Sequence, residues 1–326
     1  MKRFATLTLV VCLFATAASA LEGSWTASRD EKRPNRLYVN MSSRPTHNMG
    51  TTYPLSAFSG LTEAQINAST MTPVQFAMNR EAGNVAFEGT FRNGRGGGQF
   101  TFTADRGYIE KIRALGIPFD LDGRHRRREQ TEEEDLYSLA VHDVSTAFIK
   151  SMIAEGYKTT LEKYLEMRIF DITPEYIREM RSLGFKNVSA EELVESKIHR
   201  VTPQFVRDMR AAGWDLSLDE LQESSIHGAT PQFAEEMRKL GYGNLSHDDL
   251  VAFRIHRVTP EFITELRKLG YDKVSADDLV AMRIHRVTPE FIRELADAGY
   301  VNVPPEKLVD MRIHRIDANY LKKMRK

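Results

Sequence analysis

Residues 254–263 read Arg-Ile-His-Arg-Val-Thr-Pro-Glu-Phe-Ile, and residues 283–292 repeat this decapeptide without a change. Its histidine belongs to a series with separations of 28, 29, 29 and 29 residues: His199, His227, His256, His285 and His314. Phe170 and His142 hold the equivalent places upstream. Glycines keep the same interval: Gly156, Gly184, Gly213, Gly241, Gly270 and Gly299. A fixed period of about 20 to 50 residues is the signature of a repeat array.

Each repeat carries start and stop signals for two short helices. In the repeat from Val258, Thr259 is an N-cap, Pro260 takes the first helical position, and Gly270 ends the helix in the left-handed region. Ser275 and Asp278 have the spacing of a capping box, so a second helix begins there. Helices of about ten residues are marginal alone in water, and stacking buries a continuous core. We therefore predict an α-solenoid of 28–29-residue helix–turn–helix repeats over residues 107–326.

The repeats also predict their own core. The apolar positions assigned to it in one repeat are Phe262, Ile263, Leu266, Leu269, Leu279, Val280, Met282 and Ile284. Aromatic residues after the glycines recur in phase with them, which favours packing over a cofactor site: Phe185, Trp214, Tyr242, Tyr271 and Tyr300. A degenerate repeat begins at Tyr108, reaches Gly116 and resumes at Thr131. Its charged insertion, residues 117–131, sets basic residues 124–128 against acidic residues 132–135 and is expected on the surface.

The N-terminal part has a different period. Between residues 21 and 106 apolar residues alternate, as in Leu37, Val39 and Met41, Val74, Phe76 and Met78, Val85 and Phe87, and Phe100 and Phe102. We predict a small antiparallel β domain of five or six strands, a curled or barrel-like sheet, with Trp25 on the first strand and one helical turn within residues 60–72. Residues 93–98, Asn-Gly-Arg-Gly-Gly-Gly, lack the lysine and following helix of a phosphate loop, so a flexible hairpin is expected. The predicted fold class is thus α+β, a β domain followed by the solenoid.

The first twenty residues have the pattern of a secretory signal peptide. Lys2 and Arg3 precede an apolar run over residues 7–17, and Ala-Ser-Ala at 18–20 predicts cleavage after Ala20. The run is shorter than the ~20 residues that span a bilayer. We expect a periplasmic or secreted protein without stable membrane insertion after cleavage. Cys12, the only cysteine, would leave with the leader, so no disulfide or thiolate site is expected.

Composition and motifs argue against several functions. The 326 residues carry 45 basic and 45 acidic side chains, which gives no basic excess for nucleic acid. None of the nine histidines is followed by Glu, so the His-Glu-x-x-His zinc motif is absent. One histidine per repeat spreads ligands apart, because stacked helices lie about 8–10 Å apart and zinc ligands approach the ion to ~2.1 Å. We predict no catalytic residue, no metal and no cofactor, with the histidines donating to free carbonyls at helix ends.

Two basic series flank the histidines. The candidate partner-binding residues are Lys197, Arg254, Arg283 and Arg312 before them, and Arg257, Arg286 and Arg315 after them. Stacked in register, these residues would form cationic rows along one edge. One interpretation is a ridge for an acidic protein or a polyanionic envelope component; the other is cations whose stems cover the ends of helices.

The decapeptide with Arg-Lys-Leu-Gly-Tyr at 267–271, and Phe-Glu-Gly-Thr-Phe at 87–91, resembles a known arrangement. It is similar to the extracytoplasmic region attached to some bacterial β-lactam-sensor-type (antirepressor) membrane metallopeptidases, over most of residues 23–326. The family's transmembrane helices and zinc motif have no counterpart here, so no catalytic residue carries over. The resemblance implies a sensor-like or interaction module.

We therefore expect an exported, non-enzymatic protein that binds another macromolecule, a protein or a polyanionic envelope component, through its helical repeats. One alternative is a small-ligand sensor, which a β-domain pocket lined by Trp25, Phe76 and Phe87 would favour. Another is a hydrolase of unrecognised type, which would need carboxylates converging in one cleft.

Overall fold

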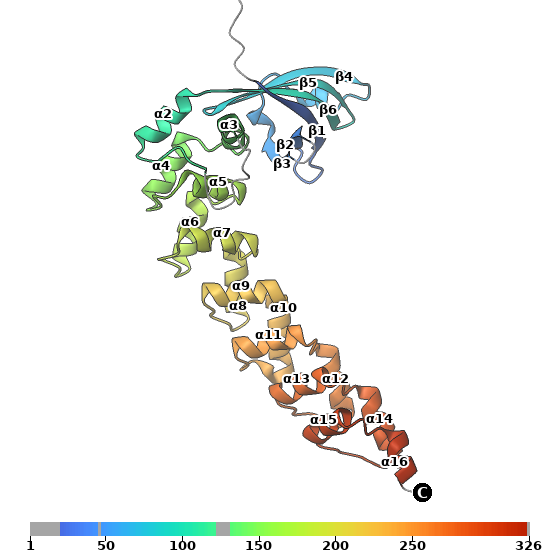
Figure 1. The fold of residues 1–326 in the computed structure, drawn as a ribbon. Helices are drawn as coiled ribbons and strands as arrows, with labels where there is room; N and C mark the ends of the chain where they lie inside the picture. Colours follow the sequence, from blue (N-terminus) through green and yellow to red (C-terminus); the bar gives the residue numbers. More distant parts are fainter. Residues whose placement is uncertain (1–19, 45–46, 122–130, 325–326) are drawn as a thin grey trace, which may run out of the picture. The chain divides into compact units, whose positions relative to one another are not determined.

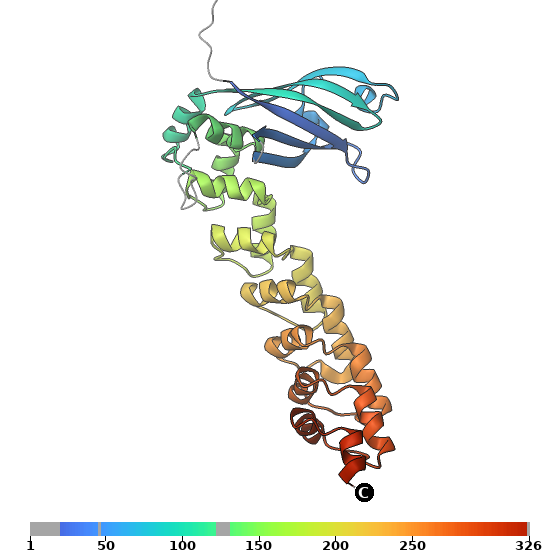
Figure 2. The same ribbon diagram turned by 45° about the vertical axis from the view of Figure 1, so that its right-hand side comes forward.

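The computed structural model describes residues 20–44, 47–121 and 131–324. The chain divides into two compact units, Met1–Ile169 (unit 1) and Phe170–Lys326 (unit 2). Figures 1 and 2 show both units from two sides. Each unit is taken by itself below.

Unit 1 begins with an antiparallel sheet. Its described strands are β1 (Leu21–Arg29), β2 (Arg36–Arg44), β3 (His47–Pro54), β4 (Thr72–Arg80), β5 (Gly83–Arg92) and β6 (Arg95–Ala104). These six hydrogen-bond in the order β3-β2-β1-β6-β5-β4, which leaves the sheet open (Figure 1). The short helices η1 (Leu55–Ala57) and α1 (Glu63–Ile66) connect β3 to β4. The predicted antiparallel domain with one helical turn between residues 60 and 72 is confirmed.

The alternating residues form the interior of this domain. Leu37, Val39 and Met41 are fully buried in β2, and Val85 is buried in β5. Trp25 in β1 is also buried, and its indole Nε1 donates to the carbonyl oxygen of Glu88 at 3.0 Å. The two-residue period thus corresponds to one buried face.

The glycine-rich stretch is mostly strand. Asn93 (φ 50°) and Gly94 (φ 77°) form the two-residue turn between β5 and β6. The following glycines, Gly96–Gly98, belong to β6. A Cβ atom on Gly98 would lie 1.9 Å from the carbonyl oxygen of Glu88 in β5, so the close approach of the backbones requires glycine there. The expectation of a flexible hairpin over residues 93–98 was therefore wrong beyond the turn.

The first helices belong to the same unit as the sheet: α2 (Gly107–Ala114), α3 (Glu132–Val141), α4 (Thr146–Ala154) and α5 (Leu161–Ile169). The ring of Tyr137 in α3 stacks on Phe100 of β6 with centroids 5.6 Å apart. The Tyr53 hydroxyl donates to the carbonyl oxygen of Val141 at 2.9 Å. The sequence places a domain boundary at residue 106. The compact units divide after Ile169, and α3 packs on the sheet within unit 1.

The acidic half of the predicted surface insertion starts a helix. Residues 132–135 form the first turn of α3, where Glu134 and Asp135 are buried. Thr131 donates its backbone N–H to the Glu134 carboxylate at 2.9 Å and accepts from the Glu134 N–H, which completes a capping box. The expectation of an exposed acidic run is thus corrected, while Thr131 is confirmed as the point where the repeat resumes. Basic residues 124–128 lie outside the described residues.

Unit 2 consists of paired helices: α6 (Pro174–Ser182), α7 (Ala190–Ile198), α8 (Pro203–Ala211), α9 (Leu218–His227), α10 (Pro231–Met237), α11 (His247–Ile255), α12 (Pro260–Lys268), α13 (Ala276–Ile284), α14 (Pro289–Asp297), α15 (Pro305–Ile313) and α16 (Ala318–Met324). A π-helical turn, η2 (Arg238–Tyr242), follows α10. Helices α7, α9, α11, α13 and α15 contact one another in succession and form one layer, here called the odd layer (Figure 2). The even-numbered helices form the other layer.

The local signals of the repeats are confirmed. The Thr259 hydroxyl accepts from the Phe262 N–H at 3.2 Å, and Gly270 ends α12 with φ 90°. The aromatic residues after the glycines join neighbouring repeats. Tyr271, for example, is half-buried and donates its hydroxyl to the carbonyl oxygen of Val303 at 2.7 Å. No helix in the described parts of the chain is long and apolar enough to cross a bilayer.

Candidate interaction surface

The first basic row lies against the helices of the solenoid. The Arg283 guanidinium is 4.9 Å above the ring of Phe262, and its Nε donates to the main-chain oxygen of His256 at 3.3 Å. Arg312 makes the same two contacts one repeat later, with Phe291 and the oxygen of His285. Each of these arginines therefore joins the end of one odd helix, the ring of the next even helix and its own helix.

The other members of this row follow the pattern in part. Arg254 lies 4.8 Å above the ring of Phe233, and the Lys197 ammonium lies 4.3 Å above the ring of Tyr176. Burial lowers the pKa of Lys197. Ser225 takes the arginine position in the remaining repeat and donates its hydroxyl to the main-chain oxygen of His199. Four of the seven cations predicted to bind a partner thus make contacts within the fold, and of these four Arg254 is also exposed.

The second basic row lies in solvent. Its members Arg200, Arg257, Arg286 and Arg315 are exposed and have φ of 58°, 57°, 57° and 56°. Each follows the histidine that caps an odd helix, and the next amide closes the turn, as Val287 does by donating to Met282 at 2.7 Å. A left-handed residue with a Cβ costs roughly 1–2 kcal/mol. Gly228 (φ 73°) occupies this position after α9, so the turn accepts glycine. Asp171 (φ 53°) and Asp143 (φ 54°) occupy it one and two repeats upstream of Arg200, so the turn does not require arginine.

A row of isoleucines, missed by the sequence reasoning, lies at the C-terminal ends of the odd helices, two residues before each position of the second basic row. They belong to the last turn of each odd helix and are 47%, 56%, 51%, 51% and 51% exposed: Ile198, Ile226, Ile255, Ile284 and Ile313. Assignment of Ile284 to the core was wrong. The signal was available: Ile284 lies seven residues after exposed Asp277, hence on the same helical face. Single exposed apolar residues are ordinary, but a contiguous row marks an interaction site.

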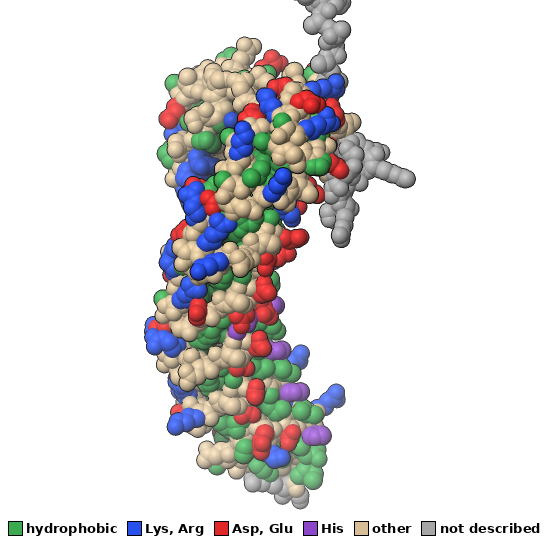
Figure 3. Space-filling model, turned by 90° about the vertical axis from the view of Figure 1, so that its left-hand side faces the viewer, with side chains coloured by type: hydrophobic (Ala, Val, Ile, Leu, Met, Phe, Trp, Pro, Cys, Tyr) green, Lys and Arg blue, Asp and Glu red, His purple; other side chains and the backbone are tan. Residues whose placement is uncertain are grey.

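Acidic residues begin the same helical face. Each odd helix has an exposed carboxylate seven residues before its isoleucine: Glu191, Asp219, Asp248, Asp277 and Glu306. These carboxylates lie in the first turn, where the positive end of the helix dipole favours them. Across the outer face of the odd layer the order is therefore acid, isoleucine, arginine. In Figure 3 the histidines of unit 2 follow one edge, with acidic side chains on one side and basic side chains on the other.

The histidines cap helices with their backbone. His256 and His285 are the C-cap residues of α11 and α13, and their carbonyl oxygens accept the bonds from Arg283 and Arg312. Among the described residues, the imidazoles of the histidine series donate to none of the free carbonyls that the sequence analysis assigned to them. The prediction of imidazole caps is corrected in this respect. Within residues 20–44, 47–121 and 131–324, no group of three or more His, Cys, Asp or Glu side chains is placed to hold a metal ion.

The repeat around α9 has a polar interior. Buried Ser224 hydrogen-bonds through its hydroxyl to Nε2 of buried His247 at 3.1 Å, and Gln222 donates to the Ser196 hydroxyl at 3.2 Å. The His247 Nδ1 atom lies 3.6 Å from the Asp248 carboxylate. These groups satisfy one another, as buried polar groups must.

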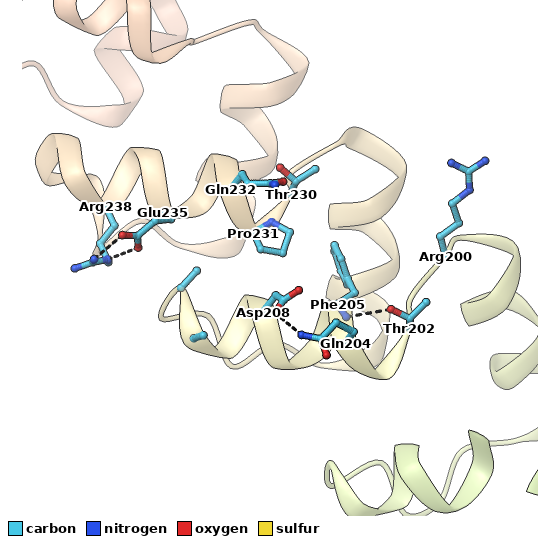
Figure 4. Close-up of a pocket in the computed structure, with 12 residues that line it drawn as sticks. Arg200, Thr202, Gln204, Phe205, Asp208, Thr230, Pro231, Gln232, Glu235 and Arg238 are labelled. Carbon is cyan, nitrogen blue, oxygen red and sulfur yellow. Dashed lines mark hydrogen bonds and ion pairs between the residues drawn. The ribbon is translucent and has the colours of Figure 1, made fainter. Parts of the chain in front are cut away.

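A hollow of about 730 Å³ lies between α8 and α10 in the even layer. Figure 4 shows two side-chain pairs in its lining: Gln204 donates to Asp208 at 2.7 Å, and Arg238 donates twice to Glu235 at 2.6 and 2.7 Å. Arg200 and Gln232 also line the hollow. The Arg238 hydrogen bonds lower the pKa of Glu235. The paired groups make this hollow a weaker candidate than the row of exposed isoleucines.

The β domain uses its aromatic rings as core. Trp25, Phe76 and Phe87 are all buried, with the two phenylalanine rings stacked at 4.6 Å and the indole 5.4 Å from Phe76. The indole meets both phenylalanine rings edge to face. Phe76 and Phe87 also line a hollow of about 280 Å³ together with Gln75, Glu88 and Thr101. Trp25 is not among its lining residues, so the pocket that would favour a small-ligand sensor is present only in part.

Comparisons with known proteins add no relative. No family model, curated protein or solved structure matches the chain.

Proposed function

We propose that the chain is an exported, non-enzymatic module that binds a protein partner through the outer face of the odd layer. The isoleucine row carries this proposal, because it exposes a large apolar side chain at the same place in successive repeats. Completing the burial of a half-exposed isoleucine is worth on the order of 1 kcal/mol. A row of them therefore favours a partner with apolar groups of its own over a purely polyanionic polymer.

The second basic row supports the same face. An apolar strip bordered by charge resembles the core and rim of protein interfaces. Residues held in sparsely populated backbone regions cluster at functional sites. Arg257, Arg286 and Arg315 keep a left-handed conformation that Gly228 adopts with less strain. Selection for their side chains at the rim of the face would explain this.

Export and a sensor-like role belong to the proposal as well. The signal-peptide pattern of residues 1–20 supports the periplasm or the outside of the cell as the location. Residues 1–19 lie outside the described residues. The resemblance to the extracytoplasmic part of antirepressor-type membrane metallopeptidases supports an interaction role without peptidase chemistry.

Capture of partners after cross-linking in the envelope fraction tests the proposal. The Ile255→Ser, Ile284→Ser, Ile313→Ser variant should lose captured proteins while its helical circular dichroism stays unchanged. A matched control removes the same number of exposed apolar residues elsewhere, by Met71→Ser, Val301→Ser and Met324→Ser. The control should capture like the wild type. Equal capture by the isoleucine variant would refute the proposal.

A glycine variant separates the role of the arginines from folding. Arg257→Gly, Arg286→Gly and Arg315→Gly together relieve the left-handed strain and remove the rim charges. The midpoint of urea unfolding of this triple variant should not be lower than that of the wild type. Its capture of partners should weaken and no longer depend on salt. A fall in stability with unchanged capture would show that these arginines serve the fold alone.

A further inference from the structure

The outer face of the odd layer is complementary to itself, and we propose that its partner is a second copy of this chain, docked with both arrays running in the same direction. This inference rests on the proposed function, because it names the occupant of the same face. It uses the acidic row, the isoleucine row and the second basic row defined above.

The spacing of the rows is the first argument. A partner for the whole face must present an apolar group opposite each isoleucine, at the interval of successive odd helices. Stacked helices lie about 8–10 Å apart. A second copy has this interval by identity. Its own isoleucine row therefore stays in register with the first over the length of the array.

Charge order is the second argument, and it selects the direction. A twofold axis parallel to the array lays isoleucine against isoleucine and turns the basic row of each copy toward the acidic side of the other. A twofold axis across the array would instead set Arg257, Arg286 and Arg315 near arginines of the second copy. Like charges in juxtaposition disfavour that arrangement. Parallel arrays are therefore the complementary solution.

The area of the outer face limits the size of the inferred dimer interface. An odd helix of nine residues is about 13.5 Å long, and five of them at ~9 Å span ~45 Å, a face on the order of 600 Å². Stable standard interfaces bury about 800 Å² per partner. The inferred dimer is thus at the small, reversible end of specific association.

Sedimentation equilibrium of the full chain from about 1 to 200 µM tests self-association. We expect a monomer–dimer equilibrium that weakens at least tenfold in the Ile255→Asp, Ile284→Asp, Ile313→Asp variant. The Met71→Ser, Val301→Ser, Met324→Ser control should dimerise like the wild type. A wild-type chain that remains monomeric throughout, or a variant that dimerises equally, would overturn the second copy as partner.

Single thiols test the direction. In residues 21–326, which contain no cysteine, Ile313→Cys or Ile198→Cys would supply the only thiol, and copper phenanthroline with oxygen would oxidise two thiols to a disulfide. Parallel arrays predict that each variant cross-links to itself. Antiparallel arrays predict efficient cross-linking only in a mixture of the two, which would overturn the inference. Ile255→Cys lies near the middle and reports proximity in either direction.

These results separate this inference from the proposed function. A monomeric chain whose isoleucine variant still loses captured proteins would refute the second copy and leave the proposed function standing. Binding that depends on the arginines but ignores the isoleucines would point to a polyanion and refute both.

Discussion

Arg283 and Arg286 stand three residues apart in one repeat and have opposite environments. Arg283 is the last but one residue of α13 and lies on a ring and a carbonyl oxygen of neighbouring helices. Arg286 follows the C-cap in the left-handed region and points into solvent. Sequence reasoning treats the two as parallel rows of one ridge. At the residue scale they divide into a structural row and a row available to a partner.

Replacement of Arg283 and Arg312 by Gln should therefore destabilise the protein, although the sequence alone suggests nearly no effect. A cation over an aromatic ring is worth about 0.5–1 kcal/mol, and a hydrogen bond from a charged group about 1.5–3 kcal/mol. Because both groups stay half-exposed, we expect a loss of about 1–2 kcal/mol per site in urea unfolding. Arg286→Gln is the matched control and should change stability by under about 0.5 kcal/mol. Equal losses at both positions would contradict the division.

His142 gives unit 1 a pH dependence. Burial, followed by the charge of Arg168, lowers the pKa of His142 from 6.5 to about 4. As the pH falls through 6.5, His142 becomes protonated in the unfolded chain. In the folded chain it becomes protonated only near pH 4. Stability from this group is thus complete above pH 6.5 and is lost between pH 6.5 and 4.

The variant His142→Phe should remove this loss, because Phe170 stands at the equivalent place one repeat later. Between pH 7 and pH 5 we expect the wild type to lose on the order of 1 kcal/mol more than the variant. Urea unfolding at both pH values measures the difference. Identical pH dependence of the two proteins would exclude His142 as the titrating group.

At the scale of elements, β6 depends on glycine for its close approach to β5. A Cβ on Gly98 would meet backbone atoms of β5 at 1.9 Å, whereas one on Gly97 has its nearest neighbour, the Trp25 carbonyl oxygen, at 3.3 Å. Backbone atoms cannot rotate away as a side chain can, so the strands would have to separate. The glycines are therefore required by the close approach of the two strands.

Gly98→Ala should lower the free energy of unfolding by about 3 kcal/mol or prevent folding of unit 1. Gly97→Ala should cost about 1 kcal/mol, since a shift of a few tenths of an ångström suffices there. Thermal unfolding followed by tryptophan fluorescence, which reports on buried Trp25, measures both. A Gly98→Ala protein as stable as Gly97→Ala would contradict the account of β6.

At the scale of the whole molecule, the division after Ile169 shows which segments fold together: the sheet with α2 to α5, and the helices that follow. Helix α3 packs its buried Leu136, Tyr137 and Leu139 within unit 1, partly against the sheet. Unit 2 contains complete helix pairs with their own caps and core. A cut at the predicted end of the β domain would expose the buried face of α3.

Residues 170–326 should accordingly fold alone, with helical circular dichroism and a cooperative thermal transition. Residues 131–326, which the repeat pattern marks as an independent helical array, should bind a hydrophobic dye and aggregate, because α3 loses the sheet. Limited proteolysis of the longer fragment should remove α3 first. Cooperative unfolding of both fragments without dye binding would show that α3 does not need the sheet.

Local chemistry determined the elements of this protein. Caps, Pro at the first helical turn, Gly at the helix end and two-residue alternation act within a few residues of the chain, so α12, α13 and the strands were predictable. The exposure of the isoleucines could also have been predicted from the sequence. Asp277 and Ile284 are seven residues apart in one helix and therefore lie on the same face of it.

Tertiary structure decided which side chains face solvent. Arg283 finds its carbonyl partner 27 residues back and its ring 21 residues back, on neighbouring helices, and no local pattern contains those distances. The packing of α3 on β6 likewise joins segments that the insertion separates in sequence. Because of this packing, α3 belongs to the same compact unit as the sheet, which ends at Ile169. The burial of a side chain depends on which elements pack against it. Only the assembled repeats therefore distinguish Arg283, which contacts neighbouring helices, from the exposed Arg286.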